Sequence, residues 1–163
     1  MVATKIEAKA DSSSLVRGLV ESLPTSSSVR VLGVTVTTNA TTEFQDDSSL
    51  QLRSFGFRDL RTGDYIEARG TSAPASGLLA AVVVREPAAA LSYLQGTATN
   101  VSSPTLTILG IMVTTTAQTQ FSAADGSALT AGAFFSQAAN KIVNVGGTVS
   151  GGAFIASEAQ IEP

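Results

Sequence analysis

In the first half of the chain, apolar and polar residues alternate along one stretch, and the alternation changes phase once. Val29 and Val31 precede the change, Val34 and Val36 follow it, and Leu32-Gly33 lies between them. Alternation with a period of two predicts strands with one buried face. A one-residue slip turns the second half to the wrong face unless a bulge or a tight two-residue turn intervenes. We favour the turn, because it brings all four valines to one core.

The same stretch occurs a second time in the chain. Residues 29–44 read VRVLGVTVTTNATTEF, and residues 106–121 read LTILGIMVTTTAQTQF, at an offset of 77. Gly110 thus takes the place of Gly33, and the threonine pairs and the closing phenylalanine keep their spacing. A chain of 163 residues can form one domain or two small ones. The internal repeat favours two copies of one folding unit.

Three further pairs of segments belong to the repeat. Each has the pattern of a strand, and the pairs are 15–20 with 93–98, 65–71 with 142–148, and 78–85 with 154–161. The first pair has a central glycine, Gly18 or Gly96, which predicts a bend or a close backbone approach. A bent first strand suits a small closed barrel. Between the strands, a short helix or turn is predicted near 57–61, with Gly63 or Asn140 as its left-handed end.

These elements predict an all-β chain with little helix, built from two tandem small β-barrels of five to six strands each. The first module is expected over residues 12–87 and the second over residues 92–163, with Pro87-Ala88-Ala89-Ala90 as the linker. Modules of roughly 70 residues bury only about 60% of their surface, so their stability is expected to be modest.

Residues 1–11 are interpreted as the last strand of a preceding repeat. Within them, 2–7 resembles 79–84 and 155–160, which close the two modules. The alternative is an ordinary N-terminal strand of the first module. A strand without its own barrel is expected to pair with an exposed sheet edge. Residues 2–9 are therefore a candidate for self-association, or for contact with a neighbouring repeat.

Composition excludes several kinds of chemistry. The chain has no cysteine for disulfides and no histidine, the commonest general base and metal ligand. Charged residues make up 14% of the chain and the net charge is −3, so no nucleic-acid partner is expected. A serine nucleophile would need Lys5, Lys9 or Lys141 as its base, and no spacing indicates such a pair. We expect no enzyme, no catalytic residue and no cofactor.

The sequence also predicts no transmembrane segment. Its longest apolar run, residues 78–84, is far too short to cross a bilayer. The N-terminal residues lack the apolar core of a signal peptide. A composition rich in Thr, Ser, Ala and Gly and poor in charge is common in exported bacterial proteins. We therefore expect a protein of the periplasm, cell envelope or extracellular space, with any export signal upstream of Met1.

The densest polar feature lies in the first module. Arg53, Arg58 and Arg61 are interleaved there with Phe55 and Phe57. Arginine beside aromatic rings is suited to an anionic or single-stranded ligand. The candidate ligand-binding residues are therefore Arg53, Phe55, Arg58 and Arg61.

The alternative is a solvated loop whose phenylalanines belong to the core. Its arginines would then pair with Asp59 and Asp64. The second module favours this alternative, because Lys141 is the only basic residue in its equivalent segment.

An acidic cluster precedes this segment. Glu43, Asp46 and Asp47 supply oxygen ligands of the kind that calcium accepts. The spacing matches no known calcium loop, and the second module keeps only Asp125. A solvated turn is favoured, and no metal site is expected.

The order of these motifs resembles a bacterial family, domain of unknown function 5666. The resemblance is carried by a strand with a central glycine, the LGVTVTT hairpin, residues 63–71 (GDYIEARGT) and Leu79-Ala80 in the closing strand. It implies tandem copies in exported or envelope proteins, and it brings no functional residue. The second module departs from the pattern, with Asn140-Lys141 in place of Gly-Asp. By analogy, the strand order is similar to small barrels of the OB type, which bind oligonucleotides, sugars or proteins.

The function predicted from these features is a non-catalytic tandem β-barrel module of a longer exported bacterial protein, acting as a spacer or protein-interaction unit. The two modules share glycines and apolar positions, whereas their charges differ. The first has seven basic and eight acidic residues, and the second has one and three. The alternative is a carbohydrate- or anionic-polymer-binding module that uses the face from Arg53 to Arg61.

Overall fold

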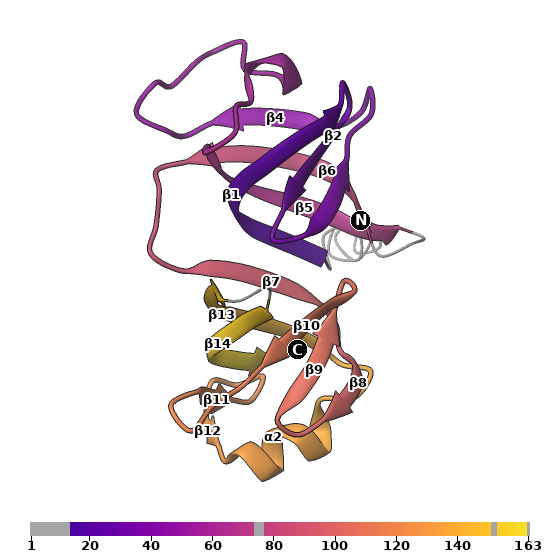
Figure 1. The fold of residues 1–163 in the computed structure, drawn as a ribbon, viewed down its shortest axis with the longest axis vertical. Helices are drawn as coiled ribbons and strands as arrows, with labels where there is room; N and C mark the ends of the chain where they lie inside the picture. The colour runs from indigo at the N-terminus through magenta and orange to yellow at the C-terminus, as the bar shows by residue number, and fades with distance from the viewer. Residues whose placement is uncertain (1–13, 74–76, 151–152, 163) are drawn as a thin grey trace, which may run out of the picture. The chain divides into compact units, whose positions relative to one another are not determined.

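A computed structural model gives the fold of the chain. It describes residues 14–73, 77–150 and 153–162. The chain divides into two compact units, Met1–Ala90 and Leu91–Pro163 (Figure 1). The strand predicted at residues 2–9 lies outside the described residues.

Regular structure in the described residues is mostly β. The helices there are the 3-10 helix η1 (Phe57–Asp59) and the α-helix α2 (Ala131–Gln137). The prediction of an all-β chain with little helix is confirmed.

Unit one contains a closed ring of strands. Its strands are β1 (Ser14–Thr25), β2 (Ser28–Val31), β3 (Val34–Thr37), β4 (Glu43–Asp46), β5 (Tyr65–Ala73) and β6 (Gly77–Glu86). The hydrogen-bonded order runs β1-β2-β3-β6-β5 and returns to β1, so five strands form a barrel. All pairs are antiparallel except β3 with β6. β4 pairs with a later part of β6, also in parallel.

β1 closes this barrel because it serves two neighbours. From Ser14 to Leu19 it pairs with β5, and from Val20 onwards it pairs with β2. Figure 1 shows β1 as an indigo ribbon that turns sharply between the two halves. The bent first strand predicted from Gly18 is confirmed.

The hairpin between β2 and β3 is a two-residue turn. Leu32 and Gly33 have φ angles of 55° and 80°, and Val31 pairs with Val34 across them. The turn prediction is therefore confirmed, and the bulge alternative is wrong. A left-handed leucine is unusual, but Leu32 is buried here. In unit two, Leu109-Gly110 forms the same turn, with φ angles of 51° and 79°.

Unit two repeats the strand order. Its strands are β7 (Ser92–Thr97), β8 (Thr99–Ser102), β9 (Thr105–Ile108), β10 (Ile111–Thr114), β11 (Gln120–Ser122), β12 (Ala128–Leu129), β13 (Ile142–Ser150) and β14 (Ala153–Ile161). The order is β7-β13-β14-β10-β9-β8. The first and last strands of this order, β7 and β8, are consecutive in the chain and are separated only by the buried Ala98. β10 and then β11 pair in parallel with β14, as β3 and β4 pair with β6.

Each unit has a β-bulge at an equivalent glycine. The register shifts at Gly70 in the β5–β6 pair and at Gly147 in the β13–β14 pair. A Cβ atom at Gly70 would lie 1.9 Å from the carbonyl oxygen of Leu79, and one at Gly147 would lie 2.0 Å from that of Ile155. No side chain fits at such a backbone approach.

A buried threonine hydroxyl follows the hairpin in each unit. Thr42 Oγ1 donates to the carbonyl oxygen of Ala80 at 2.8 Å, and Thr119 Oγ1 donates to that of Ala156 at 2.7 Å. Ala80 lies between the part of β6 that pairs with β3 and the part that pairs with β4. The threonine hydroxyl therefore supplies a hydrogen-bond donor to a backbone carbonyl group at the gap between the two parallel pairings.

The helices occupy the polar segment before β5 and the one before β13. Gly63 follows η1 with a φ angle of 94°, and Asn140 follows α2 with a φ angle of 63°. The predicted helix or turn with a left-handed end is confirmed in both units. α2 is the longer helix, since the Thr130 side chain accepts a hydrogen bond from the Ala133 amide and the ring of Phe134 is fully buried.

Candidate functional site

The predicted ligand-binding residues of unit one differ in exposure. Arg53, Arg58 and Arg61 are exposed, whereas only 7% of the Phe55 surface is exposed. The Phe55 ring packs edge-to-face against Phe44, with the ring centroids 6.2 Å apart. Phe55 is therefore part of the core and presents no open face for a ligand to stack on.

Arg58 lines an open cavity of about 630 Å³ in unit one. The cavity wall is mostly apolar and consists of Leu23, Ser26, Ser54, Gly56, Phe57, Arg58 and Leu60. The Arg61 side chain is held nearby by backbone carbonyl groups of the preceding residues. Its Nη1 donates to the carbonyl oxygens of Arg58 at 2.7 Å and Leu60 at 2.9 Å.

The aspartates of this segment stabilise turns. Asp59 Oδ2 accepts a hydrogen bond from the Gly56 amide, and Asp64 Oδ2 accepts one from the Arg61 amide, both at 2.9 Å. Short aspartate side chains readily reach backbone N–H groups two or three residues away. The ion-pair partner of Asp64 is Arg85, at 3.4 Å.

Arg85 of β6 forms a buried ion pair that sequence reasoning missed. Its Nε lies 3.1 Å from Asp46 Oδ1, and its Nη2 lies 2.7 Å from Asp46 Oδ2. The two side chains are 6% and 0% exposed. The guanidinium carbon also lies 4.6 Å from the centroid of the Phe55 ring. Arg85 thereby fixes the segment between β4 and β5 to the barrel wall.

Asp46 also belongs to the acidic cluster of Glu43, Asp46 and Asp47. Its carboxylate accepts hydrogen bonds from the amides of Ser48 at 3.0 Å and Leu52 at 2.8 Å. The Arg85 guanidinium, aided by these amides and opposed by burial, holds the pKa of Asp46 well below its usual range. Within the described ranges, no group of three or more acidic side chains lies close enough to hold a metal ion.

Unit two carries a different candidate site, a polar surface across four neighbouring strands. The register aligns two rows of residues over β7, β13, β14 and β11. We call this surface the amide platform. Its rows are Tyr93, Gly146, Glu158 and Gln120, and then Gln95, Asn144, Gln160 and Ser122.

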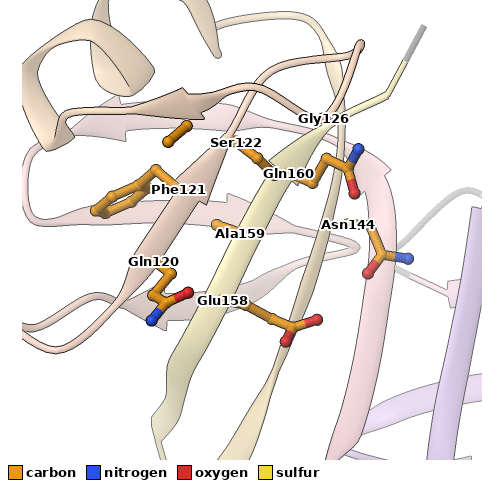
Figure 2. A pocket seen from close by; sticks show the side chains of 9 residues that line it. Gln120, Phe121, Ser122, Gly126, Asn144, Glu158, Ala159 and Gln160 are labelled. Carbon is orange, nitrogen blue, oxygen red and sulfur yellow. The ribbon is translucent and has the colours of Figure 1, made fainter.

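A cavity of about 280 Å³ opens on the amide platform. It is lined by Gln120, Phe121, Ser122, Gly126, Ala128, Asn144, Glu158, Ala159 and Gln160. Figure 2 shows Glu158 and Gln160 projecting from β14 towards Asn144, while the Phe121 ring points the other way. Phe121 packs on Phe134 with ring centroids 4.8 Å apart, so buried aromatic rings lie beneath the platform.

Hydrogen bonds hold two of the amides in place. Asn144 Nδ2 donates to Gln95 Oε1 at 2.9 Å, and Gln160 Nε2 donates to the carbonyl oxygen of Ala123 at 3.3 Å. Asn144 and Gln160 both line the cavity. The exposed Glu158 carboxylate has no side-chain partner in the described part of the chain. The surface therefore offers oriented polar groups to a ligand.

Gly146 gives the platform its shape. A Cβ atom there would lie 2.7 Å from Tyr93 Cε2 and 3.2 Å from Glu158 Cγ. The half-buried Tyr93 ring and the Glu158 side chain therefore both lie against the Gly146 backbone. This arrangement places an aromatic ring beside a carboxylate.

The equivalent surface of unit one combines charged and apolar residues. Val82 and Val84 take the positions of Glu158 and Gln160, and Arg69 lies 3.2 Å from Glu67. Arg17 and Glu67 pair across β1 and β5, as Gln95 and Asn144 do across β7 and β13. The two units thus carry different surfaces at one place in the fold.

The sequence held a signal for the amide platform that charge counting did not detect. Asn144, Glu158 and Gln160 alternate with apolar residues in their strands, which marks them as outward positions. Which strands lie side by side follows only from the fold, so the sequence did not predict the cluster.

Comparisons with known proteins give a family match. The model of a family described as a domain of unknown function (DUF5666) matches residues 17–84 and, separately, residues 95–160. No curated protein and no solved structure matches the chain. No helix in the described ranges has the length and apolar character needed to span a bilayer.

Proposed function

The chain belongs to the family described as a domain of unknown function (DUF5666), and from that premise we propose a function for its two copies. They act as a non-catalytic pair of OB-like barrels in a longer exported bacterial protein. Their role is that of a spacer or a protein-interaction unit.

The strand order supports the OB-like assignment. In unit one, the first three barrel strands are neighbours, β6 lies next to β3 in parallel, and β5 closes on β1. η1 lies between the third and fourth barrel strands. In OB folds a five-stranded barrel has this kind of partly open Greek-key arrangement. The path β7-β13-β14-β10-β9-β8 supports the same assignment for unit two.

One observation carries the proposal: the two units share what builds a barrel and differ in the groups that do chemistry. The bulge glycines Gly70 and Gly147 and the buried hydroxyls of Thr42 and Thr119 are shared. The charged surface of unit one and the amide platform of unit two are not. A common active site would require shared polar side chains.

The available side chains also support a non-catalytic role. The chain has no histidine and no cysteine. Lys141 is exposed, and it is the one lysine within the described ranges. A serine nucleophile requires a neighbouring base held in place by a third group.

Affinity capture tests the proposal. The full chain is immobilised and incubated with an envelope extract of a bacterium that encodes it, and retained proteins are quantified by mass spectrometry. We expect a specific set of envelope proteins, retained equally by the wild type and by the Arg53→Ala/Arg58→Ala/Arg61→Ala variant. Retention of nothing beyond the background of a bare support would contradict an interaction role.

A second candidate function is an anionic-polymer-binding module. It is favoured by one observation, that Arg58 lines the apolar cavity of unit one. Titration with single-stranded DNA and with an anionic polysaccharide separates it from the first proposal. Salt-sensitive binding that the triple arginine variant loses would support this second candidate.

A further inference from the structure

The amide platform of unit two has the chemistry of a carbohydrate site. Each sugar hydroxyl can both donate and accept a hydrogen bond. A planar amide or carboxylate has two polar atoms, so it can form hydrogen bonds with two neighbouring hydroxyls. Asn144, Gln160 and Glu158 present such groups side by side on β13 and β14. All three residues line one cavity (Figure 2).

An aromatic ring completes this chemistry. Tyr93 lies in the same row as Glu158, against the backbone of Gly146. An aromatic ring combines a large apolar face with a polar tip. The C–H face of a pyranose ring is apolar, so it can pack on such a ring while the hydroxyls meet the amides.

The charge of the platform indicates a neutral ligand. Glu158 is its only ionisable group besides the Tyr93 phenol, and none of its eight residues is basic. An anionic polymer would meet this carboxylate without a balancing cation. One carboxylate is also too little charge to hold a metal ion firmly.

We propose that the amide platform binds a neutral glycan through Gln120, Asn144, Glu158 and Gln160, with Tyr93 flanking the sugar rings. This site is separate from the spacer or interaction role proposed above and does not depend on it. The cavity of about 280 Å³ is at the small end of ligand sites. It accommodates one or two sugar rings, and binding is therefore expected to be weak.

NMR titration of the full chain tests the proposal. The probes are maltohexaose and hexa-N-acetylchitohexaose, each added to about 10 mM, which is ten times a Kd of about 1 mM. We expect at least one probe to shift the backbone amides of β11, β13 and β14 and the side-chain amides of Asn144 and Gln160. Unit-one amides should not move.

Two variants show whether the named side chains carry the binding. Asn144→Ala/Gln160→Ala should raise the Kd by about tenfold or more, since two hydrogen-bonding groups are lost. Glu158→Gln keeps the shape and two polar atoms, and should change the Kd less than threefold. Gln45→Ala, at the unit-one position equivalent to Ser122, is the matched control and should have no effect.

Three results would overturn the proposal. They are no shift with either probe, shifts confined to unit one, and unchanged affinity in the double variant. If the double variant fails to fold, Glu158→Ala replaces it, because Glu158 is exposed and without a side-chain partner in the described ranges. Loss of a retained envelope protein in the Asn144→Ala/Gln160→Ala capture, without sugar shifts, would make the platform a protein surface instead.

Discussion

Arg85 and Asp46 form a buried two-point ion pair in unit one, with Nη2 and Oδ2 2.7 Å apart. The register of β4 with β6 and of β11 with β14 assigns their unit-two equivalents as Ile161 and Ala123. Ile161 is buried, as Arg85 is. Equivalent positions of the two units thus hold an ion pair in one and apolar residues in the other.

This relationship predicts a specific pattern of stability in variants. Arg85→Ile alone leaves the Asp46 carboxylate buried and uncompensated, and should lower the free energy of unfolding of unit one by about 3–5 kcal/mol. Asp46→Ala/Arg85→Ile copies unit two and should recover most of that loss, because apolar residues often replace a buried ion pair without penalty. Two-dimensional NMR spectra in urea give the unfolding of each unit separately.

An exposed ion pair provides the control for this series. Arg69 and Glu67 lie 3.2 Å apart with the Arg69 side chain 51% exposed. Arg69→Ile should therefore change stability by at most about 1 kcal/mol. If the double variant at Asp46 and Arg85 were as unstable as Arg85→Ile, the equivalence with unit two would be wrong.

The same pair should make unit one sensitive to acid. The pKa of Asp46 is depressed in the folded state by Arg85, whereas an unfolded aspartate titrates near a pKa of about 3.9. The stabilising contribution is therefore complete above pH of about 4 and is lost as the pH falls further. Urea midpoints of unit one, measured between about pH 5 and pH 2, should fall steeply.

Two comparisons isolate the contribution of Asp46. The Asp46→Ala/Arg85→Ile variant should show a flatter decline over the same pH range, as should unit two of the wild type. Burial raises the pKa of Glu86, and Arg17 opposes this shift. Ionisation of Glu86 therefore lowers the stability of unit one as the pH rises above about 4.3, which is the opposite of the effect of Asp46. Equal slopes in the wild type and the double variant would refute the assignment.

The hairpin and the glycines could be predicted from sequence because their patterns are local. The phase slip at Leu32-Gly33 has only two structural explanations, a bulge and a two-residue turn, and either keeps the flanking valines on one face. Gly18 likewise predicted the bend in β1, because a glycine within a strand indicates a bend or a close backbone approach. The repeat strengthened both predictions, because the same patterns occur again in the second half of the chain.

The buried ion pair was not predictable in this way. Residues 78–84 are apolar at every position, so alternation does not reveal which side chains point inward. The bulge opposite Gly70 decides this: Leu78 and Ala80 are buried before it, and Val83 and Arg85 after it. The bulge thus turns Arg85 inward, and the apolar sequence around it does not show this change of phase. The amide platform depended likewise on which strands are neighbours.

The bulge glycines should be the least replaceable residues of each unit. Gly70→Ala would place a Cβ atom 1.9 Å from the Leu79 carbonyl oxygen, and the backbone must move to relieve the clash. We expect a loss of about 2–4 kcal/mol in unit one alone. Gly147→Ala should do the same to unit two alone, as measured by urea unfolding followed by NMR.

A glycine in open space provides the comparison. A Cβ atom at Gly56 meets no atom within 4 Å, and the φ angle there is −147°. Gly56→Ala should change stability by less than about 1 kcal/mol. A Gly70→Ala variant as stable as Gly56→Ala would show that the bulge is not required.

The buried threonine hydroxyls should each contribute measurably to stability. Thr42→Val keeps the side-chain shape but leaves the Ala80 carbonyl oxygen without its 2.8 Å donor. We expect a loss of about 1–3 kcal/mol for this variant in unit one, and for Thr119→Val in unit two. Thr37→Val, on the exposed side of β3, should be neutral or slightly stabilising, because valine favours strands. Equal effects of Thr37→Val and Thr42→Val would contradict a role for the hydroxyl.

The last prediction concerns the shape of the amide platform. Gly146→Ala places a Cβ atom 2.7 Å from the Tyr93 ring and 3.2 Å from Glu158 Cγ, so both side chains must shift. Both close contacts are with side-chain atoms and not with backbone, so the loss of stability should stay below about 1 kcal/mol. Sugar binding should weaken severalfold, because the aromatic ring and the carboxylate no longer lie in one row. Gly132→Ala, which meets no atom within 4 Å, is the control and should leave binding unchanged. Undiminished binding by Gly146→Ala would remove Tyr93 and Glu158 from the glycan site and restrict it to the row of amides.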